Sequence, residues 1–263
     1  MRFRLDAKCF VSLMVILGGC ASIESPPQDV LPADLYPARA PEPPTVPMVL
    51  PVSIGHSVEG RPIELYRFGL AARPVLIIAT IHGNERTSAA CAEALLERLR
   101  NDSGITKNNA VALILIANPD GFARHLRHNA HHIDLNRNFP ATNWTKGQQG
   151  LFHGGLTAAS EPETKALVAL IEKLNPPRIL SIHSMPQPCN NYDGPGKDLA
   201  EAMAVYNGYP VKSSIGYATP GSLGSWAGID LKIPVVTLEL PMSLNDEIAI
   251  RRNQEAISEF IRH

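Results

Sequence analysis

The sequence predicts a layered α/β fold in a single domain. Apolar strand patterns alternate with helical patterns along the chain, as expected for a sheet covered by helices. Two of the strand patterns are continuous apolar runs, which is typical of strands buried on both faces. Of the 263 residues, 44% are hydrophobic, which is enough to form a core for one domain with terminal extensions.

The first half of the domain contains two predicted strands around one predicted helix. Residues 75–81 (VLIIATI) and 111–117 (VALILIA) are the two apolar runs. Residues 85–100 have helical spacing of apolar side chains between them. The sequence Asn-Pro-Asp-Gly at 118–121 is a strong turn signal that ends the second strand.

The second half begins with a predicted helix and ends with another. Ser160 and Glu163 have the spacing of a capping box, and Pro162 fits the first turn of a helix that runs to about residue 174. Residues 179–183 and 235–240 predict two further strands. A closing helix is expected over residues 246–261.

The N-terminus predicts a lipoprotein signal peptide over residues 1–19. Its start is basic, with Arg2 and Lys8, and the apolar run at 10–17 is far too short to span a bilayer. The run ends in Leu-Gly-Gly-Cys, which resembles a bacterial lipobox with Cys20 as the lipidated residue. The resemblance implies a periplasmic protein anchored to the outer membrane by lipid. The alternative is an ordinary signal peptide in which this cysteine is incidental.

A proline-rich linker is expected to join the lipidated cysteine to the folded domain. Nine prolines lie between residues 21 and 51, so the segment 20–51 should be an extended spacer, with the domain at 52–263. The formal net charge is −1 and the basic residues are scattered, which argues against nucleic acid as a partner. No partner protein can be inferred. Cys91 and Cys189 could pair, but their spacing does not establish a disulfide.

A candidate metal site begins where the first predicted strand meets the helix. The segment 82–85 (HGNE) is an H-x-x-E motif, and zinc binds imidazole nitrogen and carboxylate oxygen. We expect Gly83 to give the backbone room to bend. His183 and Glu239 also lie at carboxyl ends of predicted strands, where active groups gather in such sheets. Each motif alone is also compatible with an ordinary strand end.

Five ordered segments together resemble the zinc carboxypeptidase family. They are HGNE (82–85), NPDG (118–121), DLNRNFP (134–140), SIHS (181–184) and TLELP (237–241). The resemblance implies a mixed, mostly parallel twisted sheet with helices on both faces. It also implies one zinc ion per chain, held by His82, Glu85 and His183, and a small peptide substrate with free carboxylates.

The resemblance implies roles for six further residues. Glu239 would be the general base and acid, with a pKa raised by its apolar neighbours. Arg127 would stabilise the oxyanion, and Asp134 would orient the first zinc histidine. Asn136 and Arg137 match the pair that binds a terminal carboxylate, so they would bind the substrate. Tyr217 would also bind the substrate, since it matches the family's mobile tyrosine, although less directly.

Within the family, residues 189–195 (CNNYDGP) and 216–222 (GYATPGS) resemble murein peptide amidases. The expected reaction is therefore hydrolysis of the γ-D-glutamyl–diaminopimelate bond in cell-wall peptides. Tyr192 and Asp193 are expected to form a polar wall of the specificity pocket. Three alternatives stay open: a general metallocarboxypeptidase, a small-molecule deacylase, and a binding lipoprotein without turnover.

Four histidines in one segment suggest a second metal site. His125, His128, His131 and His132 follow no clean ligand spacing, however, so we favour an exposed loop without a metal. Arg124 is as well explained by a solvated surface charge, and His153 receives no role.

Overall fold

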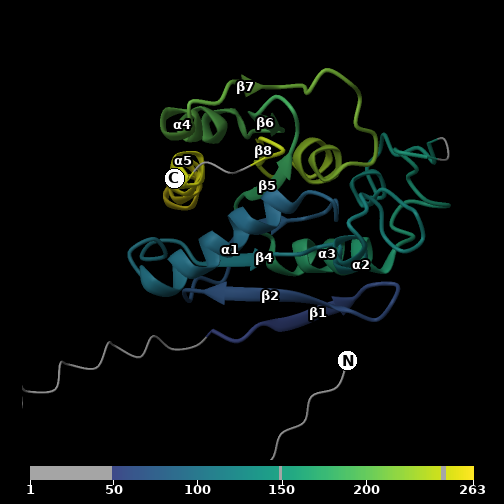
Figure 1. The fold of residues 1–263 in the computed structure, drawn as a ribbon, viewed down its shortest axis with the longest axis horizontal. Helices are drawn as coiled ribbons and strands as arrows, with labels where there is room; N and C mark the ends of the chain where they lie inside the picture. The colour runs from purple at the N-terminus through teal and green to yellow at the C-terminus, as the bar shows by residue number, and fades with distance from the viewer. Residues whose placement is uncertain (1–48, 148–149, 244–246) are drawn as a thin grey trace, which may run out of the picture. The chain divides into compact units, whose positions relative to one another are not determined.

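The structure is a computed structural model that describes residues 49–147, 150–243 and 247–263 (Figure 1). The predicted signal peptide 1–19, Cys20 and most of the predicted linker 20–51 lie outside these residues. Within the described part of the chain, none of the helices has both the length and the apolar character needed to span a membrane.

The described residues form eight strands and seven helical segments. The strands are β1 (Val52–His56), β2 (Pro62–Phe68), β3 (Val75–Ala79), β4 (Val111–Ile114), β5 (Ile179–Ser184), β6 (Cys189–Asp193), β7 (Val211–Lys212) and β8 (Val235–Leu240). The helices are α1 (Arg86–Asn101), α2 (Pro119–Arg124), η2 (Leu135–Arg137), α3 (Pro162–Leu174), α4 (Lys197–Asn207), the π-helix η3 (Gly224–Asp230) and α5 (Glu247–Arg262).

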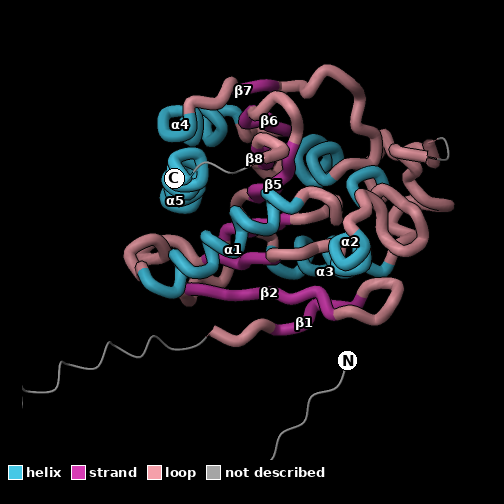
Figure 2. Tube along the Cα trace, in the orientation of Figure 1, coloured by secondary structure: helices cyan, strands magenta, loops and turns pink. Residues whose placement is uncertain are grey.

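All eight strands belong to one sheet with the order β1-β2-β4-β3-β5-β8-β6-β7, which runs across the molecule in Figure 2. The central strands β4, β3, β5 and β8 are parallel. Antiparallel pairing joins β1 to β2, β2 to β4 and β6 to β8. The predicted mixed sheet is confirmed, and its parallel centre brings the carboxyl ends of β3, β5 and β8 to one edge.

Helices cover both faces of the sheet, as expected. On one face, α1, α4 and α5 pack on a cluster that includes Ile77, Leu113 and Leu238. On the other face, α3 and η3 pack on a cluster that includes Ile78 and Ile114. Ile77 and Ile78 are neighbours in β3 but belong to opposite clusters, because successive strand side chains point to opposite faces. The apolar run therefore supplies both halves of the core.

The strand β3 ends two residues earlier than the sequence predicts. Thr80 has a φ of 56°, a left-handed conformation that a β-branched residue rarely adopts. The chain therefore leaves the sheet after Ala79 and reaches His82 through an irregular segment.

Two local predictions are corrected. Residues 118–121 begin the helix α2 instead of forming a turn, since Asn118 is its N-cap and accepts a hydrogen bond from the Gly121 N–H at 2.9 Å. The predicted capping box at Ser160 and Glu163 is wrong. Glu161 is the N-cap of α3 without a side-chain cap, and Glu163 instead accepts from the Val58 N–H at 3.2 Å. A tertiary contact thus outweighs the local one.

Candidate metal centre

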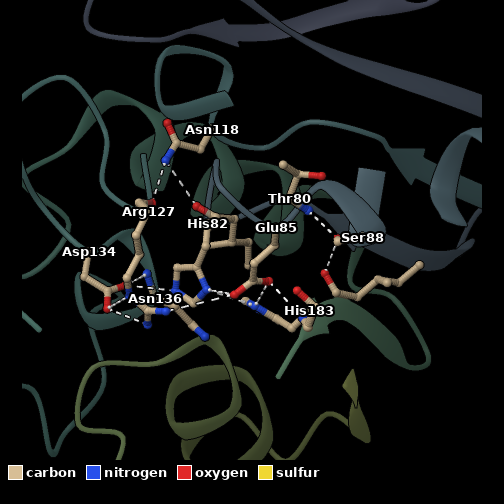
Figure 3. Close-up of polar contacts among 12 residues, drawn as sticks. Thr80, His82, Glu85, Ser88, Asn118, Arg127, Asp134, Asn136 and His183 are labelled. Carbon is tan, nitrogen blue, oxygen red and sulfur yellow. Dashed lines mark hydrogen bonds and ion pairs between the residues drawn. The ribbon is translucent and has the colours of Figure 1, made fainter. Parts of the chain in front are cut away.

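Three buried side chains meet at the carboxyl edge of the parallel strands (Figure 3). His82 follows β3, Glu85 precedes the first residue of α1, and His183 lies in β5. The Nδ1 atom of His82 is 2.6 Å from Glu85 Oε1, and the Nδ1 atom of His183 is 3.0 Å from Glu85 Oε2. The two Nδ1 atoms are 3.1 Å apart. The three predicted ligands therefore point to one place.

Gly83 is required here by a close approach of two backbones. A Cβ atom at Gly83 would lie 2.0 Å from the carbonyl carbon of Gly121 and 2.2 Å from the nitrogen of Phe122. Gly83 lies in the turn between β3 and α1, where the chain bends as expected, although its φ is not positive. The absence of a side chain is required by its packing against α2. This contact ties the metal-site segment to the helix that starts at the second motif.

Asp134 links two groups of the site. Its Oδ1 lies 3.1 Å from His82 Nε2, and its Oδ2 accepts from Arg127 Nε at 3.1 Å and Nη2 at 2.9 Å. The His82 ring is thereby held by its Nε2, which leaves Nδ1 to face the cluster. His82 and Arg127 hold the pKa of the buried Asp134 carboxyl well below its usual range, although burial acts to raise it. The carboxylate stays charged.

Glu239 lies beside this cluster on the neighbouring strand β8. It is buried, and its position in the sheet pairs it with His183. Burial raises the pKa of Glu239 to about 7, although His183 and then Arg127 oppose the shift. The raised pKa expected from its apolar neighbours is confirmed in direction. A carboxyl with this pKa can both accept and return a proton near neutral pH.

The remaining predicted site residues surround a cavity of about 60 Å³ that also touches the three clustered side chains. They are Arg127, Asn136, Arg137 and Tyr217. Arg137 is buried, and its Nη1 donates to the Asn136 carbonyl at 2.6 Å. Asn136 Oδ1 accepts from the Leu223 N–H at 2.9 Å, while Tyr217 is half exposed at the cavity mouth. The structure thus brings these four predicted residues beside the three proposed ligands.

A second, polar cavity of about 150 Å³ adjoins the first and shares Asn136, Tyr217 and Glu239 with it. Asp193 and Asn191 line it from β6. Tyr192 does not, because it lies between them in the strand and packs on the hydrophobic core of the opposite face. Asp193 therefore lines a cavity beside the candidate zinc ligands, and its role in specificity stays a prediction. The expectation that Tyr192 forms part of the same wall is wrong.

Comparison with known proteins agrees with this arrangement. The sequence model of the zinc carboxypeptidase family matches residues 46–198. The chain belongs to this family. Murein peptide amidase A of Escherichia coli K12 is 35% identical over 73% of this chain and 82% of that protein. The enzyme of the same name from Vibrio campbellii is 30% identical over 82% of this chain and 89% of its own. The crystal structure of the murein-tripeptide amidase of E. coli O157 superposes with a TM-score of 0.69 at 32% identity, covering 81% of this chain and 92% of that one.

The three clustered residues fit the zinc ion that this family implies. Two imidazole nitrogens and a carboxylate are a ligand set of catalytic zinc, which keeps one position open. Burial acts to raise the pKa of Glu85, but His82 and His183 lower it more and hold the carboxyl well below its usual range. Ligand atoms that converge this closely without an ion would leave two ring nitrogens facing one another 3.1 Å apart. A divalent cation between them satisfies all three donors.

The histidine-rich segment of this zinc carboxypeptidase holds no comparable cluster. Among the described residues, His82, Glu85 and His183 form the single group of three or more His, Cys, Asp or Glu side chains whose ligand atoms all lie within 4.8 Å of one another. His131 lies 2.8 Å from Glu161, and His128 bonds the Leu151 carbonyl. Arg124 forms an ion pair with Glu59, outside the site. Cys91 and Cys189 are both buried and free, so no disulfide joins them.

Sequence reasoning missed Phe152. The guanidinium carbon of Arg127 lies 5.5 Å from the centre of its ring, that of Arg137 lies 5.0 Å from it, and the ring of Tyr217 lies 5.8 Å away. Phe152 therefore supports three predicted site residues from one side. A single phenylalanine in a loop gives no periodic signal, so nothing in the sequence marks it.

Proposed function

We propose that this zinc carboxypeptidase hydrolyses the amide bond between γ-D-glutamate and diaminopimelate in cell-wall murein peptides. The similar enzymes whose names state this class of substrate support the proposal. The observation that carries the proposal is that two cavities adjoin. One lies at the candidate zinc ligands, and the other is lined by the Asp193 carboxylate. A cleavable amide and a cationic side chain could occupy them together.

His82, Glu85 and His183 would hold one zinc ion, which supplies Lewis-acid polarisation of the scissile carbonyl and a lowered pKa for the attacking water. Glu239 would take the proton of that water and pass it to the leaving amine, as its pKa near 7 allows. Arg127 would donate hydrogen bonds to the oxygen that gains charge in the transition state. Its hydrogen bonds to Asp134 fix its guanidinium beforehand.

The leaving portion of the substrate carries a free carboxylate, for which Asn136 and Arg137 are the proposed partners. Arginine binds a carboxylate through two parallel hydrogen bonds and keeps its charge when buried. Burial lowers the pKa of Arg137, but the nearby Asp134 opposes this shift. Tyr217 lies at the mouth of both cavities, where it could close over the bound peptide.

Asp193 would recognise the ammonium group at the far end of diaminopimelate. Burial raises the pKa of its carboxyl. Its Oδ2 accepts a hydrogen bond from Asn191 Nδ2 at 3.4 Å. The glycines Gly224 and Gly228 pack directly against this side chain, which leaves it facing the cavity. A buried carboxylate beside a polar cavity favours a cationic ligand.

The test is release of diaminopimelate from L-Ala-γ-D-Glu-meso-diaminopimelate, followed by mass spectrometry. Release should require zinc and should stop when a chelator removes it. A matched peptide in which the distal amino group is replaced by hydrogen should be a much poorer substrate for the wild type. Asp193→Asn should remove most of this preference, and an equal preference in both proteins would contradict the assignment of Asp193.

The alternative is a general metallocarboxypeptidase, which the wider family favours. Peptides made only of ordinary α-linked residues distinguish the two reactions. Rapid removal of C-terminal residues from these peptides, without cleavage of the γ-linked tripeptide, would favour the alternative.

We also propose that Cys20 is lipidated and that the enzyme is anchored to the outer membrane on the periplasmic side. The proposal rests on the basic start, short apolar run and Leu-Gly-Gly-Cys sequence at residues 17–20. Mass spectrometry of the N-terminal peptide should find a diacylglyceryl cysteine. Replacement of Cys20 by Ala should release the protein from the membrane fraction, and unchanged fractionation would contradict the anchor.

A further inference from the structure

Ser88, in the first turn of α1, connects β3, which precedes His82, with β5, which contains His183. Its side chain is completely buried. The Oγ atom accepts a hydrogen bond from the Thr80 N–H at 3.0 Å and donates one to the Ile182 carbonyl at 2.5 Å (Figure 3). A hydroxyl can accept and donate at the same time, so one side chain satisfies both backbone groups.

These two backbone groups lie where the pairing of β3 and β5 ends. Ala79 and Ile182 are the last paired residues of that parallel ladder. Thr80 follows with its left-handed conformation, and its N–H donates to the Ser88 hydroxyl. The Ser88 hydroxyl occupies the gap and continues the connection between the two strands through a side chain.

Each contact of Ser88 is made close to one proposed ligand. Its hydroxyl bonds Thr80, which His82 follows by two residues, and Ile182, which His183 follows by one. Its backbone N–H donates to the carbonyl of Glu85 at 3.1 Å. Three segments that each carry one ligand therefore meet at Ser88.

The conformation of Thr80 shows that this part of the chain is held against its local preference. A β-branched residue at positive φ costs free energy and persists where the surroundings fix it. Its own hydroxyl is buried and has no hydrogen-bond partner within the described part of the chain. Its N–H is held by Ser88, and its carbonyl accepts from the Asn118 N–H at 3.1 Å.

We propose that Ser88 is a positioning residue that sets the spacing of His82 and His183 and thereby the affinity for zinc. This inference rests on the proposed assignment of His82, Glu85 and His183 as zinc ligands. Without the hydroxyl, the Thr80 N–H and the Ile182 carbonyl lose their common partner, and the strand ends can separate. The ligand atoms are then unchanged, but the distance between His82 and His183 is no longer fixed.

The experiment compares zinc affinity in Ser88→Ala and Ser258→Ala by competition with a chromogenic chelator. Ser258 in α5 is a matched control because it is equally buried and its Oγ donates to one backbone carbonyl, that of Gln254, at 2.8 Å. Ser88→Ala should weaken zinc binding about 10- to 100-fold, as is usual when support of a metal ligand is lost. Ser258→Ala should bind zinc within about twofold of the wild type, since it leaves the ligands in place.

Ser88→Cys provides a second variant of nearly unchanged size. Its weaker hydrogen bonding should give an affinity between those of wild type and Ser88→Ala. Zinc should also raise the melting temperature of Ser88→Ala less than that of Ser258→Ala, a comparison that corrects for any general loss of stability.

The outcomes separate this inference from the assignment of the site itself. If wild-type protein fails to bind one zinc ion, or if His183→Ala binds it equally well, the proposed zinc site is wrong. If wild type binds zinc as expected and Ser88→Ala retains the affinity of Ser258→Ala, only the positioning role of Ser88 is overturned.

Discussion

His183 and Glu239 are paired positions on the adjacent parallel strands β5 and β8. This pairing places the proposed general base beside a proposed zinc ligand. Side chains carried by strands are held more precisely than side chains carried by loops, so both groups keep a fixed separation before substrate binds. The preorganised separation of these two side chains is thus a direct result of the strand order.

The first prediction concerns the role of Glu239 in proton transfer. Glu239→Gln keeps the size of the side chain but removes its ability to accept a proton. Hydrolysis of the γ-linked tripeptide should fall by about 10²- to 10⁴-fold, while zinc binding stays within about twofold. Steady-state kinetics and chelator competition measure the two quantities. Retention of near-normal turnover would mean that another group is the base.

The second prediction is a pH dependence of stability in the zinc-free protein. The folded-state pKa of Glu239 is about 7, above the ordinary value of 4.5. Burial therefore costs stability as the pH rises and the carboxyl must ionise in the folded state. Between pH 5 and pH 8, the free energy of unfolding of Glu239→Gln should improve relative to wild type by roughly 3 kcal/mol. Urea unfolding at both pH values provides the check, and a constant difference would be inconsistent with it.

A third prediction follows from the two hydrogen-bonded partners of Asp134. Asp134→Asn keeps the shape but loses the charge that holds His82 and Arg127. Zinc affinity should fall about 10- to 100-fold, and turnover of the zinc-saturated variant should also fall because Arg127 is no longer fixed. Asp198→Asn, at an exposed position in the first turn of α4, is the matched control and should change neither quantity.

The fourth prediction tests the close approach of Gly83 to α2. In Gly83→Ala, the new methyl group would meet backbone atoms of Gly121 and Phe122, which cannot rotate away. The free energy of unfolding should fall by about 1–3 kcal/mol or more, and zinc stoichiometry should drop below one. Gly104→Ala is the control, since the methyl group there meets the exposed side chain of Asp102, which can move. Equal stability of the two variants would show that the contact is absent in solution.

The fifth prediction concerns the two cysteines of the domain. Burial raises the pKa of Cys91 to about 12 and that of Cys189 to about 11, so neither forms a thiolate at neutral pH. Iodoacetamide at pH 8 should leave both unmodified in the native protein and modify both in guanidinium chloride. Peptide mass spectrometry locates the label. Rapid native labelling of either thiol would indicate that its segment opens easily.

Local sequence patterns predicted the parallel strands at the centre of the sheet and missed most of the strands towards its edges. The runs at 75–81 and 111–117 are apolar on both sides because helices cover both faces of β3 and β4. The edge strand β1 is largely exposed, and β7 has two residues, so neither has an apolar pattern to recognise. The capping box at Ser160 failed because Glu163 has a better partner 105 residues away in sequence.

The sequence by itself determined the chemical groups of the site and the strand ends that carry them. His82, His183 and Glu239 follow or end apolar strands, and this pattern is local, so it is visible along the chain. The tertiary structure alone decided which neighbours face the site. Asp193 lines a cavity and Tyr192 packs in the core because of strand register, and Ser88 bonds a carbonyl 94 positions away in sequence because of strand order. Register and strand order depend on the packing of the whole sheet, which no short segment contains.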